Sequence, residues 1–406
     1  MSIPKTKKIT KCRLCNNNKL LQIYNFGKHF VSNFVSKKNI NKGIKAPLNL
    51  VYCNNCKLLQ LEHSAPQEIM YKKFYWYRSG VTETMKIALK DIFLKVKEMS
   101  ILKKGDTILD IGANDGTLLK YFKKDGFTTI GCEPAKNLAS DLKKNCKFVI
   151  NDFWDFKHLK KILIKKKLKK PKVITAIGMF YDLENPSKFI ADAAESLDDD
   201  GVFIAQLMCL DSMIKTNDLG NICHEHLEFY SYPSLKFLFE KNGLKISKIE
   251  KNNINGGSYR IFCKKNISKS IKYKEKTSLN DIKKFIKRVE LNKTKCLNFL
   301  NKCKINGKKI FIYGASTKGN TLLQYYGINS KMIKYASERS PEKWGKYTIG
   351  SGLKIISEKK SRNLNPDYFF VMPYAFIKEF IKREKPWTKK GGKFILPYPN
   401  FKVMNN

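Results

Sequence analysis

The sequence lacks any continuous run of eighteen apolar residues, which excludes an ordinary membrane-spanning helix. Its polar, lysine-rich start also lacks the apolar stretch of a secretory signal peptide. The apolar fraction of 42% is ordinary for a globular protein, and 406 residues suffice for two or three domains with separate cores. We therefore expect a soluble, cytoplasmic protein with no membrane partner.

Acidic residues are scarce: 35 of them stand against 79 lysines and arginines, which gives a net charge of +44. Such a charge suggests nucleic-acid binding. However, only seven of the basic residues are arginine, and the lysines are spread over the whole chain. This dispersion is typical of a compositional bias rather than of a phosphate-binding stripe, so we expect no specific nucleic-acid partner. Because lysine cannot replace an arginine fork, the arginines within motif-like stretches become site candidates, namely Arg78, Arg260 and Arg339.

Disulfide bonds are not expected in the cytoplasm, so the eleven cysteines need another explanation. Four of them form two CxxC pairs, Cys12 with Cys15 and Cys53 with Cys56. Two such pairs provide four thiolates, which suits tetrahedral zinc. With four protein ligands no coordination position stays open for a reactant. We therefore predict a structural zinc centre, with strand-like runs between the pairs forming a small sheet.

The stretch DTILDIGANDGTLLKYFKKDG (106–126) predicts a buried strand, a glycine-rich turn and a helix. A second strand ends at Glu133, about 20 residues after the glycines, where such folds place an acid on ribose hydroxyls. Further strands at 147–154, 172–182 and 201–208 alternate with helices at 135–145 and 186–197. This alternation predicts a parallel sheet. The turn lacks the third glycine that a nicotinamide-binding Rossmann domain, one possible interpretation, would prefer.

The last third of the chain repeats this theme. A helical linker is expected over 278–303, beginning with a capping box of Ser278 and Asp281. The stretch KKIFIYGASTKGNTLLQYYG (308–327) then predicts another strand, glycine turn and helix. Such a turn suits an anion, and Lys318 adds positive charge. We expect a second, smaller Rossmann-like domain that holds substrate; a structural copy without a ligand is the alternative.

The stretch NICHEHLEFYS (221–231) holds two of only five histidines, one on each side of Glu225. If the segment is extended, His224 and His226 face the same way and could share a metal. Yet no HExxH motif is present, and the other three histidines are isolated. This pattern favours proton transfer by an imidazole. The alternative is that both histidines only satisfy hydrogen bonds in the core.

These motifs together resemble a known family. DIGANDGTL followed by GCEP is similar to class I S-adenosylmethionine-dependent methyltransferases. With FYWYRSGVTETM (74–85), CHEHLEFYS, NGGSYR, IFIYGASTKGN and ERSPEKWG, the chain resembles the three-domain sugar C-methyltransferases that act on nucleotide-linked keto-deoxysugars. The resemblance implies an α/β organisation in four parts: a zinc domain at 1–70, a methyltransferase domain at 71–265, a helical linker at 266–303 and a Rossmann-like substrate domain at 304–406.

The resemblance also implies roles for individual residues. His226 would be the general base, assisted by Glu225, Tyr75 and Tyr77. The cofactor site would comprise Asp110, Gly112, Asn114, Gly116, Glu133, Asp152 and Phe153. The substrate, a nucleotide-linked keto-sugar, would contact Arg78, Tyr181, Cys223, His224, Asn255, Arg260, Ser316, Lys318, Glu338 and Arg339.

Two departures from the family leave the substrate open. The deoxysugar enzymes place tyrosine where Cys223 stands and histidine near Tyr181. A thiol is a weak hydrogen-bond donor and replaces a phenol poorly. O- or N-methylation of a sugar or amino-sugar is therefore a second hypothesis, and a zinc-containing nucleic-acid-binding protein is a third. We expect a monomer or a weak oligomer.

Overall fold

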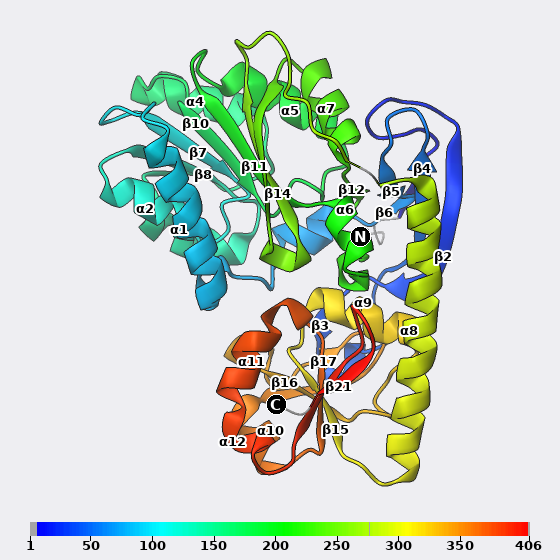
Figure 1. Ribbon diagram of the computed structural model, residues 1–406. Helices are drawn as coiled ribbons and strands as arrows, with labels where there is room; N and C mark the ends of the chain where they lie inside the picture. The colour runs from blue at the N-terminus through cyan, green and yellow to red at the C-terminus, as the bar shows by residue number, and fades with distance from the viewer. Residues whose placement is uncertain (1–5, 276, 405–406) are drawn as a thin grey trace.

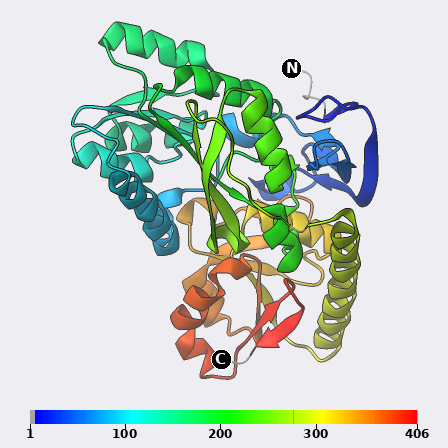
Figure 2. The same cartoon turned by 45° about the horizontal axis from the view of Figure 1, so that its top comes forward.

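The computed structural model of the protein describes residues 6–275 and 277–404 (Figure 1). Its larger sheets are a four-stranded sheet near the N-terminus, a central seven-stranded sheet and an eight-stranded sheet near the C-terminus. In Figures 1 and 2 the C-terminal part, coloured orange to red, lies below the central sheet. This arrangement confirms the predicted α/β fold class. Within the described residues no helix is both long and apolar enough to cross a lipid bilayer.

The central sheet has the strand order β13-β14-β11-β10-β7-β8-β9. Its five parallel strands confirm the predicted alternation: β7 (Thr107–Ile111), β8 (Thr128–Cys132), β9 (Phe148–Ile150), β10 (Val173–Ile177) and β11 (Val202–Met208). The antiparallel strands β14 (Ser258–Lys264) and β13 (Lys245–Asn252) extend one edge. All residues of β7, β8 and β11 are buried, as expected for parallel strands with helices on both faces.

Helices around this sheet begin where the sequence supplies caps. Asp155, Asn185 and Ser231 each accept a hydrogen bond from a backbone N–H in the first turn of the helix that follows. The helices are α1 (Glu83–Glu98), α2 (Thr117–Lys124), α3 (Ala139–Asn145), α4 (Phe156–Lys166), α5 (Pro186–Ser196), α6 (Leu210–Lys215) and α7 (Tyr232–Lys241).

The N-terminal sheet confirms the small sheet expected between the cysteine pairs. β2 (Leu20–Phe30), β4 (Lys45–Cys53) and β5 (Leu59–Leu61) are antiparallel, and β1 (Lys7–Lys8) pairs separately with β6 (His63–Ser64). The fourth strand is β12 (Glu228–Phe229), which pairs with the edge of β5. β12 follows His226 in the sequence, so the predicted base and the zinc region are joined directly.

The C-terminal sheet has the order β21-β20-β19-β15-β16-β18-β17-β3. Its parallel strands are β15 (Ile310–Tyr313), β16 (Tyr335–Glu338), β18 (Lys354–Ser357), β19 (Tyr368–Val371) and β20 (Lys393–Leu396). Its antiparallel strands are β17 (Tyr347–Thr348), β21 (Lys402–Met404) and β3 (Phe34–Val35). The helices are α9 (Thr317–Tyr326), α10 (Glu358–Asn363), α11 (Ile377–Arg383) and α12 (Lys385–Thr388). The predicted domain boundaries at 70, 265 and 303 stay predictions. Two strands pair with a strand of another predicted domain: β3 of the zinc domain pairs with β17, and β12 of the methyltransferase domain pairs with β5.

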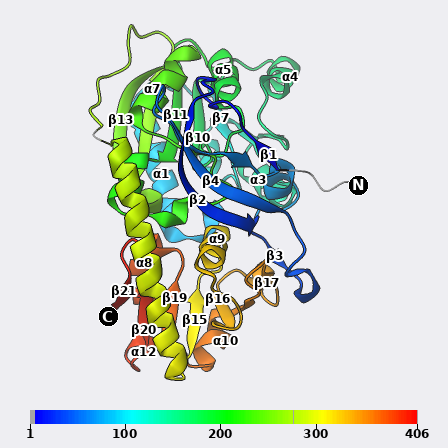
Figure 3. The same ribbon diagram turned by 90° about the vertical axis from the view of Figure 1, so that its right-hand side faces the viewer.

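The linker helix α8 (Leu279–Ile305) runs beside β2 and on to the C-terminal part (Figure 3). Its capping box forms as predicted: Ser278 accepts from the Asp281 N–H, and Asp281 accepts from the Ser278 N–H. Midway along α8, Glu290 accepts hydrogen bonds from Tyr24 on β2 and Tyr325 on α9. The helix therefore fastens the N-terminal sheet to the C-terminal domain.

Arg13, between the first two cysteines, is a buried guanidinium with several partners. It donates to the Leu61 carbonyl at 2.6 Å and to Ser64 Oγ at 2.9 Å, and its Nε lies 3.6 Å from a Glu228 carboxylate oxygen. Only 2% of the Arg13 side chain and none of the Glu228 side chain are exposed. One side chain thus holds β5, β6 and β12 together, which a single ammonium cannot do.

We predict that Arg13→Lys and Arg13→Met both lower the free energy of unfolding, by about 3–5 kcal/mol, because each leaves buried acceptors without their donor. Thermal and denaturant unfolding measure the loss. The matched control Arg339→Lys removes an exposed fork and should change the unfolding free energy by less than about 0.5 kcal/mol. Wild-type stability in Arg13→Lys would show that the fork is not needed.

Candidate functional site

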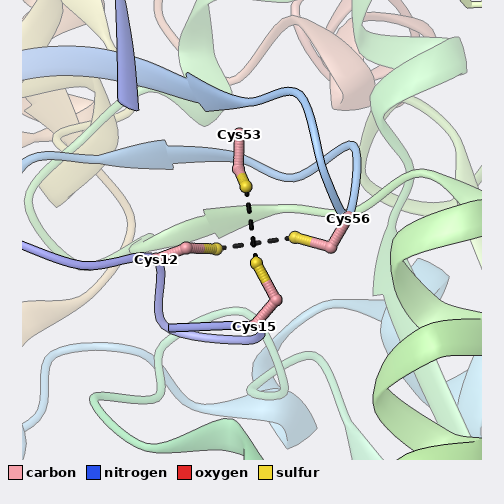
Figure 4. Close-up of side chains that lie close together, drawn as sticks. All are labelled: Cys12, Cys15, Cys53 and Cys56. Carbon is pink, nitrogen blue, oxygen red and sulfur yellow. Dashed lines mark hydrogen bonds between the residues drawn. The ribbon is translucent and has the colours of Figure 1, made fainter. Parts of the chain in front are cut away.

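The two cysteine pairs form one compact cluster, in which the four sulfurs point to a common centre (Figure 4). The Sγ atoms of Cys12 and Cys56 are 3.5 Å apart, as are those of Cys15 and Cys53, and all four lie within 4.8 Å of one another. No disulfide bond links them. Tetrahedral ligands at a Zn–S distance of about 2.3 Å lie about 3.8 Å from each other, so the cluster fits zinc.

A cavity of about 290 Å³ lies where the parallel strands β7, β8 and β10 end. Ligands of open α/β sheets bind at this carboxyl edge. Four predicted cofactor residues line it, namely Gly112, Asn114, Glu133 and Phe153, and so do Tyr75 and Tyr77. The cavity is therefore the candidate site for S-adenosylmethionine.

The glycine turn shapes one wall of this cavity. Gly112 and Asn114 both adopt positive φ, 73° and 53°, which glycine and asparagine tolerate best. The turn aims the Asn114 N–H at Glu133, whose carboxylate also accepts from the Ala135 N–H, both at 2.9 Å. Burial raises the pKa of Glu133, whereas these two N–H groups lower it. The acid is thus fixed in place at the end of β8.

Two further observations fit a bound cofactor. Gly178 lines the cavity with φ of 71°, and a Cβ there would make only an ordinary contact, 3.9 Å from the Tyr181 hydroxyl oxygen, so the wall is not crowded at this point. Trp154 also lines the cavity, and its buried indole N–H has no hydrogen-bond partner among the described residues. An unpartnered donor beside an aromatic wall suits a heterocyclic ligand with acceptor nitrogens.

The structure does not bring three other predicted cofactor residues to the cavity wall. Asp110 is buried within the sheet and accepts from Thr175 Oγ1 at 2.6 Å. A Cβ on Gly116 would lie 2.7 Å from the Asn145 Cβ, so this glycine allows α2 to pack near α3. Asp152 forms an ion pair with Lys72 at 2.9 Å.

The aromatic segment 74–80 crosses the cavity and joins two domains. Asn114 holds it from the cofactor turn, accepting from the Ser79 N–H and donating to the Tyr77 carbonyl. Trp76 donates to Asn33 beside β3 and packs edge-on against Phe34, with the ring centroids 5.1 Å apart. Tyr75 and Tyr77 therefore line the cavity while the residue between them anchors the segment to the C-terminal sheet.

Arg78 belongs to the same segment and bridges two domains. Its guanidinium pairs with Asp141 of α3 at 2.5 Å and with Glu342 of the C-terminal domain at 3.2 Å. Both contacts engage the fork that was predicted to bind substrate. Arg78 thus fixes the position of the C-terminal domain relative to the cofactor cavity.

The two histidines of residues 221–231 have separate environments. His226 Nδ1 lies 2.7 Å from the Asn221 carbonyl oxygen, so Nδ1 carries the proton and donates. The ring also packs edge-on against Tyr181 at a centroid distance of 4.6 Å. His224 instead contacts the Ala46 carbonyl of β4 through Nε2, at 3.0 Å. His224 therefore anchors the N-terminal sheet, and the two rings do not form a shared metal site.

Around His226 lies a buried polar cluster built by two domains. A nitrogen of His226, Cys223 Sγ and a Glu225 carboxylate oxygen lie within 4.8 Å of one another. Thr317 at the start of α9 donates to Glu225 at 3.0 Å. Burial raises the pKa of Cys223 and Glu225 and lowers that of His226, and the charge of neighbouring Lys318 acts to lower all three. The predicted anion turn of the C-terminal domain thus meets the predicted catalytic segment.

Other predicted substrate residues lie elsewhere or are already engaged. Arg260 is buried, donates to Gln206 and pairs with Asp91 at 2.6 Å. Ser316 caps α9 by accepting from the Gly319 N–H. The remaining three lie outside the cavity lining: Asn255 in a left-handed turn, Glu338 paired with Lys343, and Arg339 paired with Glu379.

Some residues at the site were not predicted from the sequence. Tyr71 and Asp182 line the cavity, and the Tyr71 hydroxyl donates to the Glu225 carbonyl at 2.8 Å. Asp182 follows β10 in the sequence, and a carboxyl just beyond a parallel strand is a signal that could have identified it. Tyr71 carries no comparable signal, because its role depends on a contact 154 positions away.

We predict that Cys53→Ser abolishes stoichiometric zinc binding, because the centre has no spare ligand. Elemental analysis measures bound zinc. Hydrogen exchange should accelerate both at 59–61 and at 226–229, since β12 pairs with β5. Cys303→Ser, in α8, serves as the control and should retain the metal. Unchanged hydrogen exchange at 226–229 in a zinc-free protein would show that the zinc centre does not stabilise the pairing of β12 with β5.

Three protein-family models match the chain in succession. "Putative zinc binding domain" covers residues 12–71, "Methyltransferase domain" covers 82–249, and "C-methyltransferase C-terminal domain" covers 253–399. Their order is the one expected from the motifs.

Individual relatives agree with these matches. C-methyltransferase NovU from Streptomyces niveus is 24% identical over 411 residues, which cover 98% of this chain and 97% of NovU. Among solved structures, magnesium protoporphyrin IX methyltransferase (ChlM) from Synechocystis PCC 6803 with bound SAM is 11% identical. That match covers 44% of this chain and 78% of ChlM, with a TM-score of 0.33. The three family models follow one another, and NovU is similar over its whole length, so the chain is similar throughout to the three-domain, zinc-containing C-methyltransferases. It is an S-adenosylmethionine-dependent enzyme with a structural zinc centre.

Proposed function

We propose that this C-methyltransferase acts on a nucleotide-linked keto-sugar, removing a proton α to the carbonyl and methylating the resulting enolate carbon. The observation that carries the proposal is the state of His226. Its Nδ1 proton is committed to the Asn221 carbonyl, and Nε2 has no hydrogen-bond partner within 6–275 and 277–404. An imidazole held in this tautomer presents a lone pair on Nε2 and is suited to accept a proton.

Carbon methylation requires a carbon nucleophile, which a ketone provides once its α C–H bond is broken. S-adenosylmethionine, when bound, supplies an electrophilic methyl group. The protein must therefore generate the enolate and keep it away from water. Burial of His226 and Cys223, which are 3% and 1% exposed, meets the second requirement, and the neighbouring Glu225 is partly exposed.

The electrostatics around His226 favour a neutral base. Burial and the charge of Lys318 hold the pKa of His226 well below its usual 6.5. The imidazole is therefore unprotonated at neutral pH and ready to accept the α-proton. Glu225, which accepts from Thr317, lies beside it and can orient either the imidazole or a sugar hydroxyl.

The C-terminal domain supports a nucleotide-linked substrate. Lys318 reaches the carboxyl end of β11, where its Nζ lies 3.7 Å from Met208 Sδ. Placed between the two domains, this lysine can contact a phosphate or sugar oxygen while the rest of the ligand extends toward the C-terminal sheet. Tyr75 and Tyr77, which line the cavity, are the candidate phenol donors to the sugar.

We predict that His226→Ala abolishes α-proton exchange and methyl transfer, with a loss of about 10²–10⁴ in rate. Exchange is followed by NMR in D₂O, without a methyl donor, on a panel of nucleotide-linked 4-keto sugars. Affinity for S-adenosylmethionine should survive, because His226 is not among the residues that line the cavity. His63→Gln, in β6, is the matched control and should keep activity.

The pH profile provides a second check on the same residue. Because the active form of His226 is the unprotonated one and its pKa lies below 6.5, its titration should not reduce kcat between pH 8 and 6.5. Product NMR separates a C-methyl group from a methoxy or N-methyl group. Methylation that persists in His226→Ala would disprove the base assignment, and a methoxy product would favour O-methylation.

A further inference from the structure

Asp182 is a buried carboxyl group that forms no ion pair within the described part of the chain. It is 8% exposed, it lines the cofactor cavity, and its Oδ1 is sealed without a hydrogen-bond partner. Leaving such an oxygen unpaired is costly, and a buried carboxylate without a counter-charge is costlier still. A polar group of this kind beside a cavity indicates a ligand that completes its hydrogen bonds.

The neighbours of Asp182 leave its Oδ1 without a partner. The Tyr71 hydroxyl lies within hydrogen-bonding reach of the carboxyl and also donates to the Glu225 carbonyl at 2.8 Å, but it does not pair with Oδ1. Gln67 donates its amide to the backbone carbonyl of Asp182 rather than to the side chain. The Lys318 ammonium, which acts on several acids at once, contacts Met208. Oδ1 of Asp182 therefore has no partner among these residues and is free to contact a ligand in the cavity.

From this geometry we propose that Asp182 is a catalytic residue that, as a neutral carboxylic acid, donates a hydrogen bond to the carbonyl oxygen of the substrate. The proposal rests on the function proposed above and deepens it, because it assigns the group that stabilises the enolate oxygen. Cys223 cannot fill this role well, because a thiol is a weak donor. A carboxylic acid kept neutral by a dry site is a strong one.

The charges facing Asp182 agree with a neutral form. Burial raises the pKa of Asp182 well above its usual range, and the carboxylates of Glu225 and Glu228 raise it further. Lys318 of α9 and the Tyr71 hydroxyl lower it. Two carboxyl groups in one apolar pocket do not both ionise readily. The carboxyl groups of Glu225 and Glu228 therefore favour the protonated, neutral form of Asp182.

The protons and electrons of the step balance. His226 Nε2 forms a bond to the α-proton as the C–H bond breaks, and the electron pair moves onto the carbonyl oxygen. Asp182 keeps its proton and strengthens its hydrogen bond to that oxygen. When the α-carbon forms its bond to the methyl group, the methyl–sulfur bond of the donor breaks, its electron pair stays on the sulfur of the departing thioether, and the carbonyl is restored. The proton on His226 then leaves to solvent.

Two substitutions separate the donor role from other roles. Asp182→Asn keeps an N–H donor of similar shape but cannot ionise, whereas Asp182→Leu removes the donor. We expect α-proton exchange on the panel of 4-keto sugars to fall by about 10²–10³ in Asp182→Leu and by less than about tenfold in Asp182→Asn. Asp125→Asn, which breaks a surface ion pair with Lys97, is the control and should leave exchange unchanged.

A structural measurement accompanies the kinetics. In protein labelled with ¹³C-aspartate, the carboxyl resonance that disappears in Asp182→Asn belongs to Asp182. It should keep the chemical shift of a protonated acid at pH 7.5. Circular dichroism and cofactor calorimetry check that Asp182→Leu is folded. If it is not folded, the α-proton exchange rate of Asp182→Asn relative to wild type still tests whether a donor at this position is sufficient.

The outcomes distinguish this proposal from the one on which it rests. If the wild type exchanges the α-proton but Asp182→Asn is as slow as Asp182→Leu, or if the resonance is that of a carboxylate, Asp182 is not the donor and the reaction still stands. If the wild type exchanges no α-proton with any probe, the proposed reaction is wrong, and the role of Asp182 on an enolate falls with it.

Discussion

The pairing of β12 with β5 is the contact on which the site depends most. Zinc ligation fixes Cys53 and Cys56 on either side of the turn that leads into β5, and β5 hydrogen-bonds to the chain just after His226. The Leu227 carbonyl accepts from the Leu61 N–H at 2.9 Å, while the Tyr181 carbonyl accepts the N–H of Leu227 from the other side. The imidazole is therefore held between a metal-stabilised sheet and the end of β10. A structural zinc, remote from the cofactor, in this way fixes the geometry of the proposed chemistry.

Arginine is used sparingly in this chain, and its positions follow a physical rule. Where one cation must satisfy acceptors from several elements, the chain has arginine: Arg13 among β5, β6 and β12, Arg78 between two domains, and Arg383 among Tyr313, Glu358 and Glu379. Lysines instead make mostly single, exposed ion pairs, such as those of Lys97 and Lys308. Two of the three arginines singled out by this scarcity, Arg78 and Arg260, hold the fold rather than a ligand, whereas the third, Arg339, makes an exposed ion pair.

What could be predicted from the sequence depended on how local the physics is. The cysteine pairs, the strand–turn–helix around Gly112 and the capping box at Ser278 are set by neighbours in the chain, and the structure has each of them. His224 and Arg78 could not be assigned in this way, because their partners Ala46 and Glu342 are 178 and 264 positions away. The same limit hid Tyr71, whose partner Glu225 is 154 positions away. Local motifs therefore identified the chemistry, whereas tertiary contacts decided which residue faces the cavity.

The short strand β3 has a consequence for how the chain can be divided. It covers the β17 edge of the C-terminal sheet, although it comes from the first forty residues. A protein that lacks residues 1–70 would lose this cover, and β12 would lose its partner β5. Uncovered strand edges are templates for pairing with other chains, so the shortened protein would be prone to aggregation even if its two Rossmann-like domains folded. The N-terminal region thus covers strands of both neighbouring domains, so it cannot be removed without exposing them.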